Sequence, residues 1–512
     1  MKEVRLAENT RGRFWYRGTL SGLLVGLYFA FCTNCGATGL SQPGVGRSCK
    51  EIADGKYPGL VIESATRITS SGAFSPRPGA VAGAIGPPFC RIIAVAHPTA
   101  DSNIRLELWV PEGKAWNGKF EQRGNGGFAG SIEYDGMYLP LARGYAVAAT
   151  DDGHDTADDT DASWALGHPE KVKDFGWRAV KVTTDAAKQL LKSLTGRKPE
   201  RSYFVGCSDG GREALMTAQR FPRDFDGIVA GAPGYAWTDL MSFAGRMSQS
   251  LNAAAGALSP AKLPMLQRAA LAACADGGGY IKNPLACHFD PGTLACKGHS
   301  SSGCLTGGEI KSLQLIYGGV HEPLPGRSLP GFEPGAEAAV NSWGFWIVPG
   351  ANGQVRPYLE RMSKNFYAYI VRGEPSFDLN ALSIADIDRA RREIGPILNA
   401  MDADLSDFRT HGGKLIQYHG WNDPAIPPRY SLEYHARVVA KLGPSSDFYR
   451  LFMIPGMLHC SGGAGPGDVD WQTLIENWVE RGSAPTSVSA TSDADYNSQE
   501  IAAVPDSIEG QR

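Results

Sequence analysis

Residues 202–220 restrict the fold more than any other part of the sequence. An apolar run at 202–205 leads into a glycine-rich turn at 206–211, and helical spacing of apolar residues follows from 212 to 220. The turn reads Gly206-Cys207-Ser208-Asp209-Gly210, which fits the pattern G-x-S-x-G. In that pattern the glycines leave room for a serine on a strained strand-to-helix turn. A short buried strand that runs directly into a helix is a building unit of a parallel sheet.

Other segments repeat this alternation of strand and helix. Alternating or continuous apolar residues predict strands at 104–110, 119–122, 145–149, 415–418 and 451–454. Helical spacing predicts helices at 175–194 and 471–481, the latter ended by Gly482. Strands that alternate with helices indicate an α/β fold, in which a mostly parallel sheet is covered on both faces.

The segment 235–373 interrupts this alternation. It is rich in Gly, Ser and Pro, it holds four cysteines between 274 and 304, and it contains the aromatic group Trp343, Phe345 and Trp346. We interpret it as a lid inserted over the loop face of the sheet and held by disulfides, because its own core is thin. The core would then comprise a first part at 38–234 and a second part at 374–512, a division suited to a chain of 512 residues.

The N-terminal segment predicts export. Arg11, Arg13 and Arg17 precede an apolar run at 20–31, and small residues follow near Ala37. This order is typical of a secretory signal peptide at 1–37, and the run is shorter than the roughly twenty residues that a membrane span needs. We therefore expect a secreted or periplasmic protein with no stable membrane span after processing, the alternative being a retained anchor.

Cysteine number and net charge limit the function further. Of ten cysteines, cleavage would remove Cys32 and Cys35 and leave eight, an even number that allows full pairing in about 105 connectivities. The counts of 50 Lys+Arg and 53 Asp+Glu give a formal charge of -3, so no basic field favours a nucleic-acid partner.

A serine hydroxyl needs a base within hydrogen-bonding reach and a carboxylate that orients the base. On this kind of turn the expected chain order is serine, acid, histidine. His459 follows a late strand in a glycine-rich loop, and Asp423 directly follows the predicted strand at 415–418. His419 is the rival base, but it precedes its candidate acid. We therefore predict Ser208, Asp423 and His459 as a catalytic triad.

The cysteines beside two of these residues support the prediction. Cys207 precedes Ser208 and Cys460 follows His459. If the serine and the histidine are hydrogen-bonded, their neighbours could lie within the Cα separation of about 4.4–6.8 Å that a disulfide needs. The alternative is that the two cysteines pair elsewhere.

An oxyanion hole needs backbone N–H groups where negative charge develops. The N–H of Asp209, directly after the serine, is the first candidate, and the loop at 124–127 offers the second through Gly126 or Gly127. Trp343, Phe345 and Trp346 are candidates for contacts with an aromatic substrate or, equally, for the core of the lid. We interpret Asp151, Asp152 and Asp155 as capping groups and charge near the cleft entrance.

Four stretches resemble the tannase/feruloyl esterase family, which includes the mono(hydroxyethyl) terephthalate hydrolases. They are GNGGFAG at 124–130, GCSDGG at 206–211, GKLIQYHGWNDPAIP at 413–427, and PGMLHCSGG at 455–463. The resemblance runs from about residue 49 to 485. It implies an α/β-hydrolase core with an inserted lid, the triad above, and four disulfides: Cys207–Cys460, Cys49–Cys90, Cys274–Cys287 and Cys296–Cys304. It also implies hydrolysis of esters of aromatic acids such as ferulate and gallate.

The sequence departs from the family in one respect. Family lids usually carry a calcium loop with several aspartates, whereas the loop between Cys274 and Cys287 offers only Asp276. Calcium takes about six to eight oxygen ligands. We therefore expect a lost or weak calcium site, predict that no metal or organic cofactor is required, and assign Asp276 to a turn.

The resulting hypothesis is a secreted serine esterase that acts on small aromatic esters through an acyl-enzyme. Two alternatives remain open: a non-catalytic secreted binding protein on a hydrolase scaffold, and a serine peptidase of the same fold. The sequence does not choose among feruloyl, galloyl and terephthaloyl esters. A substrate with a free carboxylate would need a cation from the lid, for which Arg361 and Lys364 are candidates.

Overall fold

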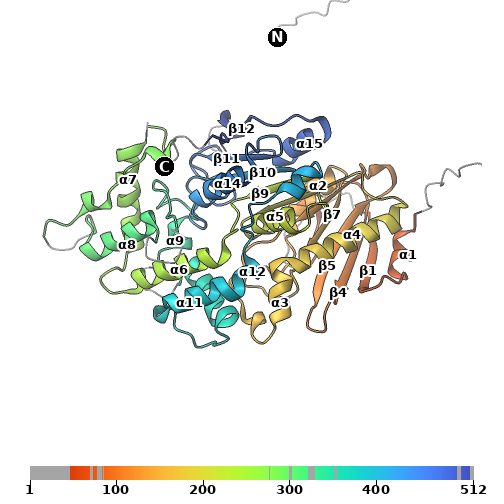
Figure 1. Cartoon of the computed structure of the whole chain (residues 1–512), viewed down its shortest axis with the longest axis horizontal. Coiled ribbons are helices and arrows are strands. Elements are labelled where there is room, and N and C mark those ends of the chain that lie inside the picture. Colours follow the sequence, from red (N-terminus) through yellow and green to blue (C-terminus); the bar gives the residue numbers. More distant parts are fainter. Residues whose placement is uncertain are drawn as a thin grey trace, which may run out of the picture. The chain divides into compact units, whose positions relative to one another are not determined.

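The computed structural model describes residues 46–69, 73–77, 83–84, 86–275, 277–298, 302–320, 329–350, 355–492 and 498–507. The predicted signal peptide at 1–37 lies outside these residues. At the centre is a nine-stranded sheet with the strand order β1-β4-β5-β7-β6-β8-β9-β10-β11 (Figure 1). The strands are β1 (Leu60–Ile68), β4 (Phe89–Ala96), β5 (Ile104–Pro111), β6 (Lys119–Arg123), β7 (Ala146–Thr150), β8 (Arg201–Cys207), β9 (Gly227–Gly231), β10 (Lys414–Gly420) and β11 (Tyr449–Ile454).

The sheet has an antiparallel edge and a parallel body. Strands β1, β4, β5 and β7 pair antiparallel, whereas β7, β6, β8, β9, β10 and β11 pair parallel in that order. All six predicted strands, including the one at 202–205, are confirmed, each within a few residues of its expected bounds. The prediction missed β1, β4 and β9. The mostly parallel α/β sheet is confirmed.

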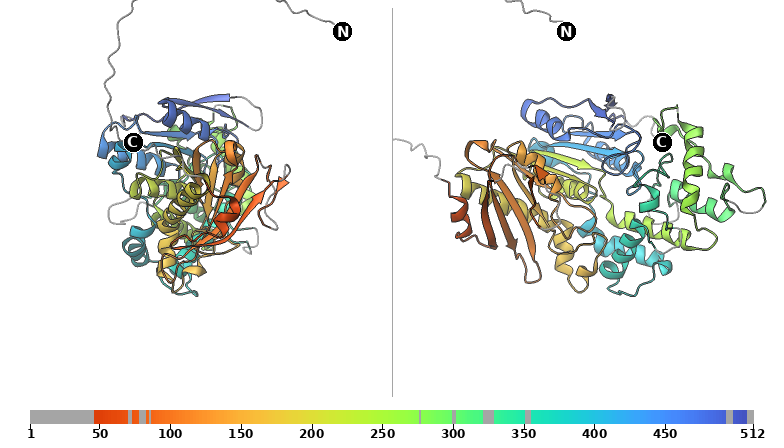
Figure 2. Two further views of the ribbon diagram at one scale, coloured as in Figure 1. Left: turned by 90° about the vertical axis from the view of Figure 1, so that its right-hand side faces the viewer. Right: turned by 180° about the vertical axis from the view of Figure 1, so that it is seen from behind.

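Helices cover both faces of the sheet (Figures 1 and 2). Along β7, Ala146 and Ala148 belong to one buried cluster, and Val147 and Ala149 belong to another. Because successive side chains of a strand point to opposite faces, the two clusters form two cores, one on each side. Helices α4 (Ala179–Thr195), α5 (Asp209–Arg220) and α14 (Arg429–Leu442) contribute to the first core, and α2 (Asp135–Ala142) and α15 (Trp471–Arg481) contribute to the second.

The two predicted helices form where expected. Helix α4 is preceded by a π-helical turn, η3 (Asp174–Arg178), so the predicted helix at 175–194 is continuous with it. Helix α15 ends at Gly482, whose φ of 71° places it in the left-handed conformation that closes a helix. The short N-terminal helix α1 (Cys49–Ala53) lies against β1 and is joined to β4 by the Cys49–Cys90 disulfide.

The predicted lid lies in the long segment between β9 and β10, drawn in green to teal in Figure 1. This segment contains the disulfides Cys274–Cys287 and Cys296–Cys304. Its longer helices are α6 (Trp237–Asn252), α7 (Leu263–Cys274), α8 (Gly307–Gly318), α10 (Tyr358–Asn365) and α11 (Ile384–Arg389), with the single turn α9 (Trp343–Trp346) between α8 and α10. The bounds 235–373 remain a prediction, since helices after 373 also precede β10. Among the described residues, no helix combines the length and apolar character needed to cross a bilayer.

Candidate active site

Ser208 lies on a sharp turn between β8 and α5. Its φ of 64° and ψ of -117° are unusual for a residue with a side chain, and surrounding hydrogen bonds hold them in place. The Ser208 N–H donates to the Gly231 carbonyl at 3.0 Å, and the Ser208 carbonyl accepts from the N–H groups of Arg212 and Gly234. A Cβ atom on Gly206 would lie 2.5 Å from the Gly210 carbonyl oxygen. The glycines of the motif are therefore required by close backbone packing.

Asp423 and His459 form the acid–histidine pair that the sequence predicts. His459 Nδ1 lies 2.8 Å from Asp423 Oδ2, while Asp423 Oδ1 accepts from the N–H groups of Ala425 and Ile426. One carboxylate oxygen thus fixes the turn and the other faces the imidazole. Burial alone would raise the pKa of Asp423, but attraction to His459 and hydrogen bonds from both His419 and His459 outweigh it and hold this pKa well below its usual range.

The rival base His419 lies on the buried side of the acid. It has no exposed surface, and its Nε2 lies 3.1 Å from Asp423 Oδ2 and 3.1 Å from the Ile426 carbonyl oxygen. Its Nδ1 lies 2.7 Å from Ser431 Oγ. Both ring nitrogens are engaged within the protein, so the geometry places His419 as a group that orients Asp423, whereas His459 is partly exposed.

A disulfide joins the loop of the histidine to the turn of the serine. Cys207 and Cys460 are 253 positions apart in the sequence and are bonded, with their Cα atoms 5.9 Å apart. Their neighbours Ser208 and His459 are thereby brought to the same edge of the sheet, beyond the carboxyl ends of β8 and β11. The structure contains all four pairings that the family resemblance implies.

The glycine loop at 124–127 packs directly on the serine turn. The Gly210 N–H donates to the Asn125 carbonyl at 2.7 Å, and a Cβ atom on Gly124 would lie 2.6 Å from the Gly210 Cα. Gly127 has a φ of 57°, and a Cβ atom there would lie 2.6 Å from the Tyr358 hydroxyl. Among the hydrogen bonds of the described residues, none uses the N–H of Gly126 or Gly127. Either group is therefore available to a bound oxyanion.

Aromatic residues of the lid reach the histidine. The Trp346 ring lies edge-on to the His459 ring, with centroids 5.1 Å apart, and it also contacts Tyr358. Phe345, 48% exposed, and Trp346 line a cavity of about 450 Å³ together with His459. Trp343 is buried against Tyr317 instead and does not line this cavity.

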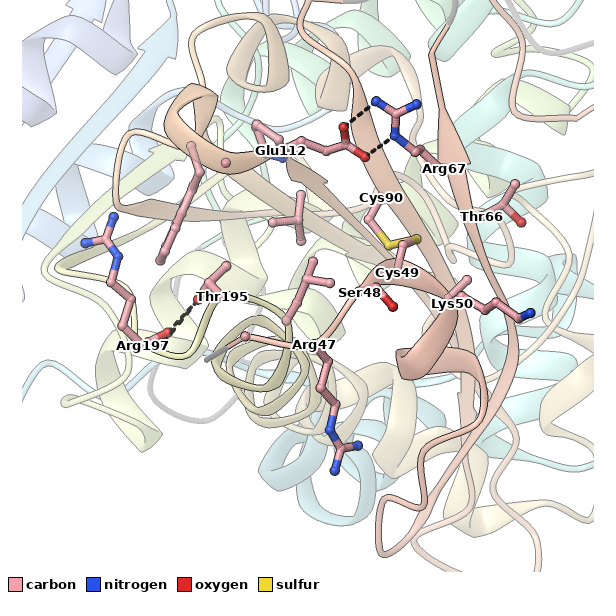
Figure 3. A pocket seen from close by; sticks show the side chains of 17 residues that line it. Arg47, Ser48, Cys49, Lys50, Thr66, Arg67, Cys90, Glu112, Thr195 and Arg197 are labelled. Carbon is pink, nitrogen blue, oxygen red and sulfur yellow. Dashed lines mark hydrogen bonds and ion pairs between the residues drawn. A yellow bond between two sulfur atoms is a disulfide. The ribbon is translucent and has the colours of Figure 1, made fainter. Parts of the chain in front are cut away.

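A larger cavity, of about 790 Å³, lies elsewhere on the molecule (Figure 3). It is formed around the Cys49–Cys90 disulfide by α1, the edge strands and the end of α4, and none of the predicted catalytic residues lines it. Several basic side chains surround it, of which Arg67 is paired with Glu112 at 2.6 Å.

The acidic residues that the sequence singled out lie in different environments in the structure. Asp276 lies outside the described residues, and the described positions between Cys274 and Cys287 carry no carboxylate, so this donor set does not fit calcium. Asp151 caps its loop by accepting from the Gly153 N–H at 2.8 Å, and Asp155 is exposed. The expectation that Asp152 lies near the cleft entrance is wrong, because Asp152 has no exposed surface.

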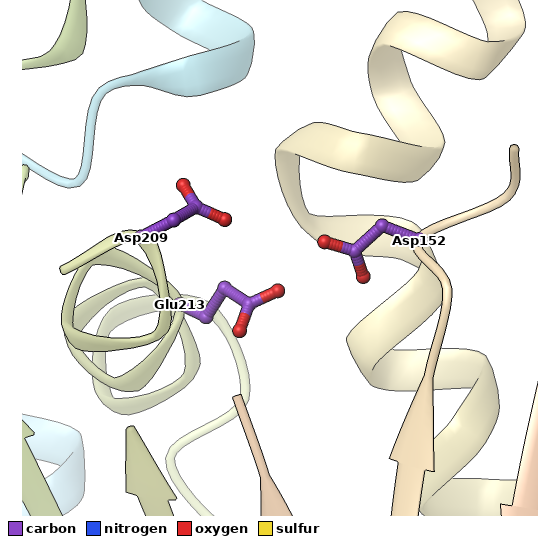
Figure 4. A group of neighbouring side chains, drawn as sticks. All are labelled: Asp152, Asp209 and Glu213. Atoms are coloured by element: carbon purple, nitrogen blue, oxygen red, sulfur yellow. The ribbon is translucent and has the colours of Figure 1, made fainter. Parts of the chain in front are cut away.

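Asp152 instead lies beside Asp209 and Glu213 of helix α5 (Figure 4). The Asp209 side chain is also buried and binds Arg212, so only the backbone N–H of Asp209 remains a candidate for the oxyanion hole. Sequence reasoning missed Glu213. Its spacing from Ser208 gave no signal, because a glutamate on the first turns of a helix is usually an exposed charge.

We expect that replacing both Cys207 and Cys460 with alanine will lower the free energy of unfolding by about 2–5 kcal/mol. We also expect kcat to fall by about tenfold or more, because a misplacement of about 1 Å between reacting groups is costly. Urea unfolding and ester hydrolysis would measure the two effects. The matched control is the double alanine variant of Cys296 and Cys304, which should lose stability but keep kcat. Equal losses of kcat in both variants would contradict a specific role of the Cys207–Cys460 bridge.

Comparison with known proteins agrees with this geometry. The family model of tannase and feruloyl esterase matches residues 90–505. An uncharacterized esterase of Xanthomonas campestris is 37% identical over 500 residues, covering 88% of this chain and 85% of that protein. A protein described as "Probable feruloyl esterase B-1" from Aspergillus flavus is 32% identical over 425 residues, covering 78% of each chain.

A solved structure extends the comparison to the fold. The crystal structure of feruloyl esterase B from Aspergillus oryzae superposes with a TM-score of 0.81 at 26% identity, covering 90% of this chain and 96% of that one. The region matched by the family model, 90–505, includes the serine turn, the acid loop, the histidine loop and the parallel strands that carry them. The chain therefore belongs to the tannase and feruloyl esterase family and is a carboxylic ester hydrolase.

Proposed function

We propose that the chain hydrolyses its ester in two steps through an acyl-enzyme on Ser208. Ser208 Oγ attacks the ester carbonyl carbon while His459 Nε2 accepts the hydroxyl proton. The C–O bond to the alcohol then breaks, and His459 returns the proton to the leaving oxygen. Water repeats the sequence on the acyl-enzyme and releases the acid. The 2.8 Å contact between His459 Nδ1 and Asp423 Oδ2 carries this proposal, because Nδ1 is engaged by the carboxylate and Nε2 is the ring nitrogen that remains to accept a proton.

The oxyanion of each tetrahedral intermediate needs donors on the same side as Ser208. We assign this role to the backbone N–H of Asp209 and to that of Gly126 or Gly127. Two observations support the assignment: Asp209 begins helix α5, where N–H groups lack helical partners, and the glycine loop is hydrogen-bonded to Gly210 on the same helix. These steps use protein groups and water only, so we propose that the enzyme needs no metal or organic cofactor.

The proposed substrates are small esters of aromatic acids, such as feruloyl or galloyl esters. Phe345 and Trp346 support this class, because both line the cavity that reaches His459. The similarity to proteins described as feruloyl esterases also supports an aromatic-acid ester as the substrate. Arg361 is hydrogen-bonded to Thr160 and lies 3.3 Å from Asp158, so its charge is already partly neutralised. A panel of methyl esters that vary in ring hydroxyls, read as kcat/KM, tests the class. Preference for an aliphatic acyl group would contradict it.

We expect Trp346→Ala to raise KM for methyl ferulate by about tenfold, because an aromatic contact and buried apolar area are lost. The kcat should change less, since Trp346 makes no hydrogen bond to the His459 ring. Trp343→Phe serves as the control, because Trp343 packs within the lid. Steady-state kinetics with methyl ferulate and methyl acetate measures the effect. An equal rise in KM for both esters would argue against an aromatic pocket.

We also propose that the protein is exported to the periplasm or secreted. Four disulfides support this, since such bonds persist in oxidising compartments.

A further inference from the structure

Three carboxylates lie together beside the first turns of helix α5 (Figure 4). Asp152 comes from the loop after β7, and Asp209 and Glu213 come from α5. Their exposed fractions are 0%, 1% and 1%, and one oxygen from each lies within 4.8 Å of the others. Ionised carboxylates this close repel one another, and burial removes the water that would solvate them. The cluster therefore needs a source of positive charge or protons.

Asp209 has its own partner. Arg212 donates from Nε to Asp209 Oδ1 at 2.5 Å and from Nη2 to Asp209 Oδ2 at 3.2 Å, and it also donates to the carbonyls of Phe175 and Gly176. This buried pair is neutral overall. Asp152 and Glu213 make no ion pair within the described part of the chain. Both oxygens of Asp152 and Oε1 of Glu213 also lack a hydrogen-bond partner there.

The other oxygen of Glu213 holds the glycine loop. Glu213 Oε2 accepts from the Asn125 N–H at 2.9 Å, and the Asn125 carbonyl accepts from the Gly210 N–H at 2.7 Å. Asn125 is thus fixed at both its N–H and its carbonyl. It directly precedes Gly126, and its carbonyl belongs to the same peptide unit as the Gly126 N–H. Glu213 thus holds the Gly124–Asn125 peptide, which directly precedes the peptide that carries the Gly126 N–H.

One proton can join Glu213 Oε1 to one of the two unpartnered oxygens of Asp152. If Glu213 is a neutral acid, its Oε1 hydroxyl donates to Asp152 while its Oε2 carbonyl still accepts from Asn125. Burial, Asp152 and Asp209 together raise the pKa of Glu213 well above its ordinary value, and burial raises the pKa of Asp152 to about 7. The charged or titratable groups facing the pair are Asp209 and Arg212, with the Asn125 amide beside Asp152. His154, two residues on, has a pKa lowered by burial to about 4 and is therefore neutral.

We propose that Glu213 is a positioning residue of the oxyanion hole, a neutral acid that shares its proton with Asp152 and holds the backbone N–H of Asn125, next to the peptide that carries the Gly126 N–H. This inference rests on the proposed function, because it concerns the donor that would stabilise the oxyanion on Ser208. Glu213 itself touches neither the serine hydroxyl nor the substrate.

The glutamine variant tests the proton directly. In Glu213→Gln, the amide oxygen accepts from Asn125 and the amide N–H donates to Asp152, so both contacts of the neutral acid are reproduced. We expect kcat within about threefold of the wild type for Glu213→Gln but about 30- to 100-fold lower for Glu213→Ala, with little change in KM, which is the signature of a weakened oxyanion donor. Asp152→Asn, whose amide can donate to Glu213, should also keep kcat. The Asp152→Asn variant keeps the shared hydrogen bond testable if Glu213→Ala does not fold.

Glu309→Ala is the matched control. Glu309 is also buried, accepts from the Thr306 N–H and pairs with Lys262, but it lies on the lid helix α8. We expect it to lower the melting temperature without changing kcat.

The pH dependence of stability separates a shared proton from simple packing. A carboxyl whose pKa is raised on folding binds a proton, so stability falls as the pH rises from the unfolded pKa of about 4.3 toward the folded pKa. The melting temperature of the wild type should therefore fall more steeply between pH 5 and pH 8 than that of Glu213→Gln, which has lost this proton.

Several results would overturn the proposal. If a folded Glu213→Ala variant kept the wild-type kcat, the positioning role of Glu213 would be ruled out. Equal loss of kcat in Glu213→Gln and Glu213→Ala would show that a carboxylate is required, and about one equivalent of metal in the purified wild type, by elemental analysis, would assign the cluster to a cation. If the melting temperatures of the wild type and Glu213→Gln depended on pH in the same way, the shared proton would be ruled out. A wild type that a fluorophosphonate does not label would instead contradict the proposed function, whatever the Glu213 variants show.

Discussion

Replacing Ser208 with alanine is expected to lower kcat for methyl ferulate by about 10⁵- to 10⁶-fold, the loss seen when a serine hydrolase loses its nucleophile. The residual rate should come from substrate binding and the oxyanion hole alone. The turn should survive, because its hydrogen bonds come from the backbone of Ser208 and from neighbouring glycines. The melting temperature should therefore stay close to that of the wild type.

Ser202→Ala is the matched control for this experiment. Ser202 lies on the same strand, β8, but near its opposite end, where its N–H donates to Asp226. Its loss should leave kcat unchanged. A Ser208→Ala enzyme that keeps more than about one per cent of wild-type kcat would show that another group is the nucleophile.

The second large effect is expected for Asp423→Asn, which should lower kcat by about 10⁴-fold because an amide favours the wrong tautomer of the histidine. Asp423 uses one oxygen for the turn and the other for His459, and asparagine can still accept from Ala425 and Ile426. The fold should therefore persist, as circular dichroism and thermal unfolding would show. The measurement is kcat with an activated ester near neutral pH.

His419 tests the assignment of the base. We expect His419→Gln to lower kcat by only about tenfold, since it removes one support of Asp423, and His459→Ala to abolish turnover as Ser208→Ala does. If His419→Gln is the more damaging of the two, the roles of the two histidines must be exchanged.

The sequence predicted the parallel body of the sheet better than its edge. Strands such as β8 and β10 are short and apolar because both faces are covered, and this composition is visible without a structure. Strand β1 has a mixed burial pattern with many exposed positions, so no clear alternation marks it. Strand β9 reads Gly-Ile-Val-Ala-Gly, too short and too rich in glycine to separate from a loop.

In the candidate site, too, local sequence patterns predicted some residues and not others. Ser208, Asp423 and His459 each follow a strand in a recognisable motif, so local patterns were sufficient to propose them. The roles of Trp343 and Trp346 could not be separated, because the packing of the lid alone decides which ring faces Tyr317 and which faces His459. Asp152 and Glu213 meet only through the fold, and a charged residue in a sequence carries no sign that it will be fully buried.

Reaction with a fluorophosphonate, followed by mass spectrometry of the intact protein and its peptides, tests the central claim most directly. We expect one phosphonate per chain, on Ser208, in a peptide that remains joined by its Cys207–Cys460 bridge to the peptide of His459 until a reductant is added. An enzyme that hydrolyses esters but is labelled at another residue, or is not labelled at all, would contradict that claim.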